Sequence, residues 1–144
     1  MADYSAPLRD IEFALEHLAD LEALSGYGAF AHAEPAMVRG VMDEAGRFMN
    51  EVIAPLNRTS DLEGSVWKDG EVVTPTGFQE AYTRYVEAGW GGVPFDPAYG
   101  GGGFPWLVAI ALQEMLSSAC MSFSMAPLLT QGAIDMLAHH ADET

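Results

Sequence analysis

The chain has 144 residues, which is enough for one domain with a hydrophobic core. Apolar residues make up 49% of it and charged residues 19%, and this balance excludes an intrinsically disordered segment. The formal net charge is -15, from 6 basic and 21 acidic residues, and the basic residues are scattered singly. Nucleic acid and anionic membrane surfaces require clustered Lys and Arg, so we expect neither as a partner.

The single cysteine and the terminal and apolar segments indicate the cellular setting. With Cys120 alone, no intramolecular disulfide can form, which suits a reducing cytoplasm. The first eight residues lack the basic start and the apolar run of a secretory signal. The longest apolar stretch, from Phe104 to Leu112, is too short to span a bilayer. We therefore expect a cytoplasmic protein that does not act at a membrane.

An amphipathic helix is predicted near the start of the chain, from Leu8 to Leu24. Its apolar residues recur at three- and four-residue steps, with Pro7 as an initiating residue and Gly26 as a stop. A loop should follow over residues 27–35.

The second predicted helix, from Ala36 to Leu56, has the cleanest helical stripe of apolar residues in the chain. Pro55 should end or kink it, because proline cannot donate a helical hydrogen bond. The polar residues 57–64 are then expected to form a turn.

A short hairpin is predicted next, because Asp69-Gly70 lies between two β-favouring pairs in the segment from Trp67 to Val73. Thr74 and Pro75 should then cap and open a third helix, which Gly89 closes.

Two further helices are predicted after a glycine-rich loop over residues 90–105. The helix from Trp106 to Ala119 is apolar on nearly all sides, so it should be buried all round. The last helix should run from Ser124, as its cap, to His139. Five helices and one hairpin give an all-α fold. The all-apolar helix needs more neighbours than these elements supply, and no closing element follows residue 141, so we expect the chain to be part of a longer protein.

The glycine-rich loop has two interpretations. A phosphate-binding loop would lie between a strand and a helix and present its amides to the anion. This loop lies between two helices and lacks a Walker lysine, so we favour a long turn whose glycines allow positive φ and close approach.

Other candidate sites have ordinary structural interpretations. His139 and His140, with Asp142 and Glu143, could suggest a metal site, but adjacent helical residues point about 100° apart, so a solvated helix end is the better interpretation. Glu114 could be a base, although a buried salt bridge or cap is favoured. Cys120 has no basic neighbour in sequence and is interpreted as packing.

The start of the last helix could line an apolar pocket. Methionine and small residues are suited to a pocket that accepts flexible chains, although ordinary core is the favoured interpretation. The cluster comprises Ser122, Phe123, Ser124, Met125, Ala126, Leu128 and Leu129.

These segments together resemble a known family, the flavin-dependent acyl-CoA dehydrogenases. The glycine-rich turn with Tyr99-Gly100-Gly101, then Gly103-Phe104-Pro105 and Gln113-Glu114-Met115 at the end of an apolar helix, resembles the family signature. Residues 3–13 resemble the N-terminal extension of a long subfamily that includes 3-methylmercaptopropionyl-CoA dehydrogenase-like and broad-chain enzymes. Residues 54–58, Asp61 and residues 73–78 also fit that subfamily.

The resemblance implies a domain organisation. Residues 1–34 would be the extension helix and loop, and residues 35–144 the N-terminal helical domain, an orthogonal bundle. The flavin-binding β-domain and the C-terminal helical bundle of a full enzyme would then lie outside this chain.

The resemblance also implies a function. A full enzyme oxidises an acyl-CoA thioester to the 2,3-enoyl-CoA, with a glutamate that removes the α-proton and FAD that accepts the β-hydrogen as hydride. Electron-transferring flavoprotein would reoxidise the flavin, and a homo-oligomer is expected. The base and most flavin contacts belong to later domains, so no catalytic, cofactor-binding or metal residue is assigned here, and this fragment alone is expected to be inactive and free of FAD.

By the same resemblance, the first turns of the last helix would floor the acyl pocket. The substrate-binding candidates are Phe123, Ser124, Pro127, Leu128 and Gln131. The alternative to an enzyme fragment is a non-enzymatic helical interaction module.

Overall fold

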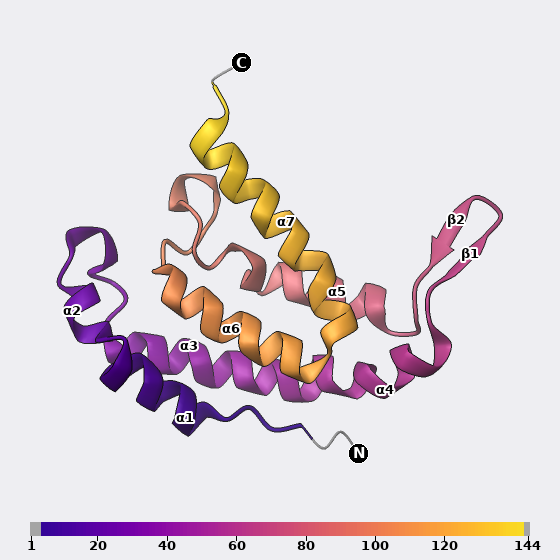
Figure 1. The fold of residues 1–144 in the computed structure, drawn as a ribbon, viewed down its shortest axis with the longest axis horizontal. Coiled ribbons are helices and arrows are strands. Elements are labelled where there is room, and N and C mark those ends of the chain that lie inside the picture. The colour runs from indigo at the N-terminus through magenta and orange to yellow at the C-terminus, as the bar shows by residue number, and fades with distance from the viewer. Residues whose placement is uncertain (1–3, 143–144) are drawn as a thin grey trace.

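A computed structural model describes residues 4–142 of the chain, and these residues are mostly helical (Figure 1). The expected all-α fold with one short hairpin is confirmed. The α-helices and strands are α1 (Leu8–Phe13), α2 (Leu21–Ser25), α3 (Pro35–Phe48), α4 (Ala54–Glu63), β1 (Val66–Lys68), β2 (Glu71–Val73), α5 (Phe78–Glu87), α6 (Trp106–Ala119) and α7 (Met121–His140). None of the helices in this described part has the length and apolar character needed to cross a bilayer.

The helices form an open bundle in which α3 and α4 make one long axis (Figure 1). Helix α6 lies along α3, and α7 turns away from the end of α6 and passes α5. The core lies where α6 packs on α3 and on the π-helical residues 49–53 that follow α3, and its fully buried side chains include Val38, Met49, Val108 and Met115. The hairpin of β1 and β2 extends away from this body, and all six of its strand residues are exposed.

The single helix expected from Leu8 to Leu24 is wrong in detail. A π-helical segment, Ala14–Leu18, follows α1, and the chain then breaks at Asp20, whose φ of 52° is left-handed. The Asp20 side chain accepts a hydrogen bond from the Ala23 N–H and so caps α2 as a separate helix. The apolar periodicity does continue across this break, because Ile11, Leu15 and Leu21 are all buried.

Pro55 does not end its helix, contrary to one of the expectations. A π-helical segment, Met49–Ile53, precedes it and runs directly into α4, so Pro55 lies in the first turn of α4 and the helix continues past it. The turn expected over residues 57–64 is also wrong, because α4 continues to Glu63. Gly64, with a φ of 65°, ends it.

The predicted hairpin is confirmed, with Trp67 opposite Val72 in antiparallel register. Asp69 and Gly70 both have positive φ, which is the conformation that favours a tight two-residue hairpin turn. Thr74 and Pro75 do not open a helix: α5 starts at Phe78, after Gly77. The Thr76 N–H instead donates to the Glu63 carboxylate at 2.7 Å, which ties the base of the hairpin to α4.

Helix α6 has the predicted bounds, but it is not buried all round within this chain. Ile110 is 63% exposed and Trp106 is 46% exposed. Helix α7 begins earlier than expected: Cys120 has an extended backbone and accepts the first helical hydrogen bond from the Ser124 N–H. Ser124 is therefore inside the helix rather than at its cap, and Pro127 lies in the helix interior.

Candidate functional site

The five substrate-binding candidates lie on two neighbouring stripes of α7. Phe123, Pro127 and Gln131 follow one another at four-residue steps, so they share the face that meets α5 and the glycine-rich loop. Ser124 and Leu128 form the adjacent stripe. Phe123, Ser124 and Pro127 are buried, whereas Leu128 is 42% exposed.

Phe123 belongs to an aromatic cluster with α5. Its ring centroid lies 5.5 Å from that of Phe78 and 6.1 Å from that of Tyr85, both in edge-to-face geometry. Tyr82 lies 6.4 Å away on the same side. The arrangement is favourable for aromatic rings and fixes the distance between α5 and α7.

Two surface grooves flank this cluster, and Tyr82 lines both. The loop groove, of about 240 Å³, lies between α5, the glycine-rich loop and α7. Its lining residues are Tyr82, Tyr85, Val86, Gly89, Gly91, Gly92, Gly100, Pro127, Thr130, Gln131 and Ile134. The hairpin groove, of about 480 Å³, lies on the other side and is lined by Val72, Thr74, Phe78, Gln79, Tyr82, Ser122, Phe123 and Ala126.

The candidates are thus divided between the grooves. Pro127 and Gln131 line the loop groove and Phe123 lines the hairpin groove, while Ser124 and Leu128 line neither. Neither lining contains an acidic, basic or histidine side chain. Such walls can hold an apolar group and exclude water from it, and they offer no carboxylate or imidazole for proton transfer.

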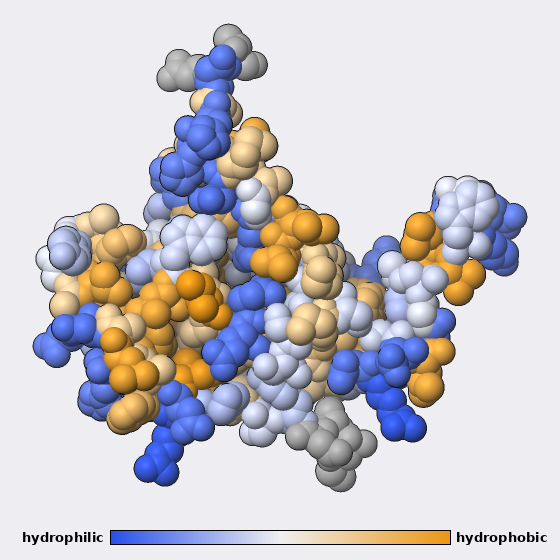
Figure 2. All heavy atoms as spheres, in the orientation of Figure 1, coloured by the Kyte–Doolittle hydropathy of each residue, from blue (hydrophilic) through white to orange (hydrophobic). Residues whose placement is uncertain are grey.

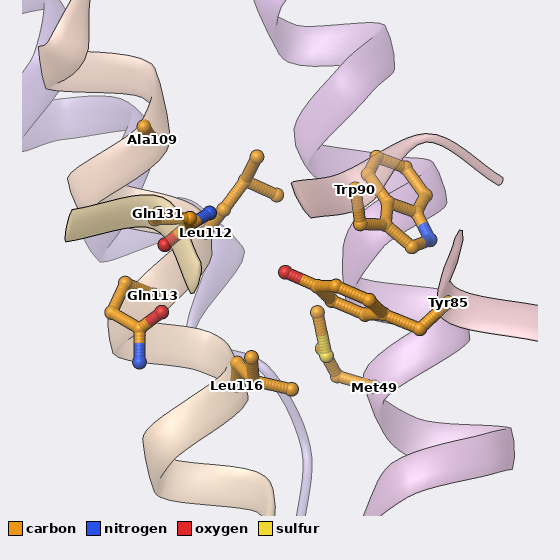
Figure 3. Close-up of a pocket in the computed structure, with 8 residues that line it drawn as sticks. All are labelled: Met49, Tyr85, Trp90, Ala109, Leu112, Gln113, Leu116 and Gln131. Atoms are coloured by element: carbon orange, nitrogen blue, oxygen red, sulfur yellow. The ribbon is translucent and has the colours of Figure 1, made fainter. Parts of the chain in front are cut away.

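A small inner void lies behind the loop groove, and Tyr85 and Gln131 border both (Figure 3). Its volume of about 10 Å³ is close to the space that one water molecule needs. The Tyr85 hydroxyl points across the void toward α6, where Gln113 lies in the wall. Burial, with a smaller effect from Tyr82, raises the pKa of Tyr85 to about 12, so this hydroxyl is a neutral donor at ordinary pH.

Gln131 lies in the wall of the loop groove next to the inner void. Its side-chain N–H donates to the Gly91 carbonyl at 3.2 Å, which joins α7 to the glycine-rich loop. Sequence reasoning included Gln131 but missed Tyr85 and Gln113. Tyr85 belongs to the predicted apolar face of the third helix, and nothing in its local sequence distinguishes a core tyrosine from one that lines a groove.

Ser124 has a structural role in this arrangement. The Gln113 amide donates to the Ser117 hydroxyl at 3.0 Å, Ser117 donates to Ser124 at 3.3 Å, and Ser124 donates to the Met121 carbonyl at 2.8 Å. This chain of hydrogen bonds joins α6 to the first turn of α7. The hydroxyl is therefore occupied rather than directed at either groove.

The glycine-rich loop satisfies its own amides. The N–H groups of Gly102, Gly103 and Phe104 donate to the carbonyls of Gly92, Phe95 and Val93, at 2.9–3.0 Å. The Gly101 N–H donates to Asp96 in the same way. Amides engaged within the loop cannot also converge on an anion, which supports the turn interpretation over phosphate binding.

The other candidates that the sequence raised are the histidines at the end of α7, Cys120 and Glu114. Among residues 4–142 no group of three His, Cys, Asp or Glu side chains is placed to hold a metal, and Glu143 lies outside these residues. Cys120 is buried, with its sulfur 3.4 Å from the Ser122 hydroxyl. Glu114 is exposed, so the buried salt bridge expected for it is wrong. The pKa of Tyr4 is raised mainly by the burial of Tyr4 itself, and the negative charge of Glu114 adds to that shift.

Comparisons with known proteins agree with the architecture. Residues 36–144 match the family described as acyl-CoA dehydrogenase, N-terminal domain. The chain is 42% identical over 135 residues to 3-methylmercaptopropionyl-CoA dehydrogenase of Ruegeria pomeroyi, an alignment that covers 94% of this chain and 23% of that protein. It is 29% identical to butyryl-CoA dehydrogenase of Syntrophomonas wolfei, over 98% of this chain and 24% of the relative.

A third relative is the broad-specificity linear acyl-CoA dehydrogenase of Mycobacterium tuberculosis, 28% identical over 83% of this chain and 20% of the relative. The chain thus spans about a quarter or less of the length of the curated relatives that it matches. The family match covers α3 to α7 and both grooves. The chain belongs to the acyl-CoA dehydrogenase family and carries its N-terminal helical domain.

Proposed function

We propose that this domain forms one wall of the acyl-chain pocket in an FAD-dependent acyl-CoA dehydrogenase that oxidises acyl-CoA thioesters to 2,3-enoyl-CoA. The observation that carries the proposal is the loop groove, an uncharged groove on the family's own domain whose wall includes the α7 residues Pro127 and Gln131. Tyr82 and Val86 would contact the acyl methylenes and exclude water. Gln131, tied to Gly91, would limit how deeply the chain enters.

We infer that FAD binds outside the described residues. The amides of the glycine-rich loop are engaged within the loop, and the groove linings contain no charged side chain to receive a pyrophosphate. We therefore assign FAD and the catalytic base to other domains of the enzyme. Electron-transferring flavoprotein as electron acceptor, a homo-oligomeric assembly and a cytoplasmic location belong to the same proposal. The alternative, a non-enzymatic interaction module, is favoured by no comparable observation.

A variant that fills the loop groove tests the proposal. In a complete polypeptide that contains this domain and its flavin, Thr130→Phe places a ring in the groove wall. We expect the KM for long-chain acyl-CoA to rise about tenfold, which corresponds to roughly 1.4 kcal/mol of lost binding, with a smaller effect on short chains. The matched control is Thr83→Phe, which adds the same ring to an exposed position of α5 outside both linings.

Flavin bleaching by acyl-CoA measures the activity. If no acyl-CoA of any length reduces the flavin of the complete polypeptide, the proposed activity is wrong. If both threonine variants behave alike, the activity stands and the loop groove is not the acyl pocket. Purified residues 1–144 alone are expected to be colourless, and stoichiometric flavin on them would contradict the assignment of FAD to other domains.

A further inference from the structure

The segment before α3 contacts the glycine-rich loop, 70 residues later in the sequence. His32 lies between a short 3-10 turn, Gly28–Phe30, and α3, and its Nε2 lies 3.1 Å from the Gly102 carbonyl. A carbonyl accepts, so the imidazole N–H donates in this contact. The His32 ring also packs edge-to-face on Phe104, with centroids 4.9 Å apart. The family match begins at residue 36, so this contact comes from outside it.

The loop segment that His32 contacts is hydrogen-bonded to the loop segment that borders the groove. The Gly102 N–H donates to the Gly92 carbonyl at 3.0 Å, and the Phe104 N–H donates to Val93 at 3.0 Å. The two loop segments are too close for a side chain at this point, because a Cβ on Gly102 would lie 2.8 Å from the Val93 carbonyl oxygen. A displacement of Gly102 would therefore strain its contacts with Gly92 and Val93.

The loop also forms one wall of the groove. Gly91, Gly92 and Gly100 line the loop groove, and the Gly91 carbonyl holds the Gln131 amide at 3.2 Å. A continuous path of direct contacts thus runs from His32 through Gly102 and Gly92 to the groove and Gln131. Ala33, fully buried next to His32, anchors the start of this path in the core.

We propose that His32 is a positioning residue for the acyl groove: its hydrogen bond to Gly102 sets the distance between the glycine-rich loop and α7. The inference rests on the proposed function, because it assigns that groove to the acyl chain. His32 does not line the groove, so it acts on the substrate through the loop and contributes no contact of its own. Its loss should loosen the loop wall and weaken acyl binding while leaving the chemical step nearly unchanged.

Two substitutions separate the hydrogen bond from the ring packing. His32→Phe keeps a ring against Phe104 and removes the donor, whereas His32→Gln keeps an N–H donor at a similar reach and removes the ring. His17→Phe is the matched control, because His17 belongs to the same N-terminal segment and its ring packs on Phe13 rather than on the loop. All variants are made in the complete polypeptide with its flavin.

Two measurements give the outcome. His32 is exposed, so water replaces part of the lost bond, and for His32→Phe we expect the KM for acyl-CoA to rise about three- to fivefold with kcat nearly unchanged. Amide hydrogen exchange of peptides covering residues 91–104 should accelerate about tenfold, while exchange in α3 and α6 stays at the wild-type rate. His32→Gln and His17→Phe should retain values within about twofold of wild type.

Several outcomes would overturn the inference. A wild-type KM and loop exchange in His32→Phe would show that the hydrogen bond positions nothing. Full activity in His32→Phe with a defect in His32→Gln would assign the effect to ring packing instead. Faster exchange throughout the domain would indicate general destabilisation. If the wild type oxidises no acyl-CoA, the proposed function fails, and a change in loop exchange would support the His32 contact without the groove's assignment.

Discussion

Gly101 shows how closely two segments of the glycine-rich loop approach each other. A Cβ at this position would lie 2.0 Å from the Phe95 carbonyl oxygen, far inside van der Waals contact. Gly101→Ala must therefore push the two loop segments apart. We expect a loss of about 2–3 kcal/mol in the free energy of unfolding, measured by urea denaturation. Gly132→Ala, which meets nothing within 4 Å in α7, should instead gain about 0.5–1 kcal/mol. Equal effects of the two changes would refute the close packing of the loop.

Tyr85 makes the free energy of unfolding of the domain depend on pH in the alkaline range. Burial first, and Tyr82 second, raise its pKa from an ordinary value of 10.0 to about 12, so the folded state favours the neutral phenol. The stabilisation is complete below pH 10, the pKa in the unfolded chain, and is lost as pH rises toward 12. Two pKa units correspond to at most about 3 kcal/mol.

Tyr85→Phe should therefore flatten the fall in stability between pH 10 and 12, as followed by urea denaturation at several pH values. Tyr4, whose pKa is raised in the same direction, would leave part of the slope in this variant. A variant curve as steep as that of the wild type would show that Tyr85 ionises as readily in the folded domain as in the unfolded chain.

At the residue scale, part of the lining of the loop groove could be predicted from the sequence, and the substrate-binding role of these residues stays a prediction. The sequence resemblance located Pro127 and Gln131, which do line a groove, because they lie on one helical face. It could not show that Ser124 hydrogen-bonds to Ser117, because that contact depends on how α6 and α7 cross. Tyr85 and Gly91 were missed for the same reason: each lines the groove through packing between segments distant in sequence.

At the scale of elements, the N-terminal segment is held mainly by its apolar face. Arg39 of α3 forms ion pairs with both Glu12 and Glu16, but all three side chains are substantially exposed. Exposed pairs contribute less than about 1 kcal/mol, so Arg39→Gln should change stability little. Leu15 is buried, and Leu15→Ala should destabilise by about 2–4 kcal/mol.

Leu18→Ala is the control for that comparison, because Leu18 is 76% exposed and its truncation should be nearly neutral. Thermal or chemical unfolding of the three variants measures the difference. A larger loss from Arg39→Gln than from Leu15→Ala would mean that the ion pairs, rather than the apolar face, hold the segment to α3.

The helix with the fewest polar residues was predicted best, whereas the helix with the cleanest apolar stripe continues past its predicted end at Leu56. Helix α6 has the predicted bounds, since its apolar residues leave few polar groups to compete with helical hydrogen bonds. Errors arose where a polar side chain had two possible roles. Asp20 starts a new helix by capping α2, whereas Ser124, an equally plausible cap, bonds to neighbouring groups inside α7. The choice depends on tertiary contacts that local sequence does not report.

At the scale of the whole molecule, many large apolar side chains of α6 and α7 are exposed to solvent. Figure 2 shows apolar side chains along α7 and at the hairpin. The exposed large side chains on α6 and α7 are Trp106, Ile110, Met121, Met125, Leu128, Leu129, Ile134, Met136 and Leu137. Exposed apolar side chains gathered on two neighbouring helices are typical of a contact face, and on an isolated domain they promote self-association.

Charge opposes that association but does not prevent it. The net charge is -15, yet most acidic residues precede Pro97 in sequence, and α7 carries one acidic residue, Asp135, in the helix. Repulsion between copies is screened over about 10 Å at moderate ionic strength. Burying about 500 Å² of apolar surface would contribute on the order of 12 kcal/mol before the entropy of association, at 25 cal/mol per Å².

We therefore expect purified residues 1–144 to self-associate, and more strongly as salt is added. Leu129 is 71% exposed on α7, so Leu129→Glu should weaken association without changing helix content, whereas Leu18→Glu, equally exposed on the N-terminal segment, should not. Sedimentation equilibrium over a range of concentration and salt measures the effect, with far-UV circular dichroism as the check on folding. A compact monomer at high concentration and high salt would show that the apolar face of α6 and α7 is too discontinuous to hold a second copy.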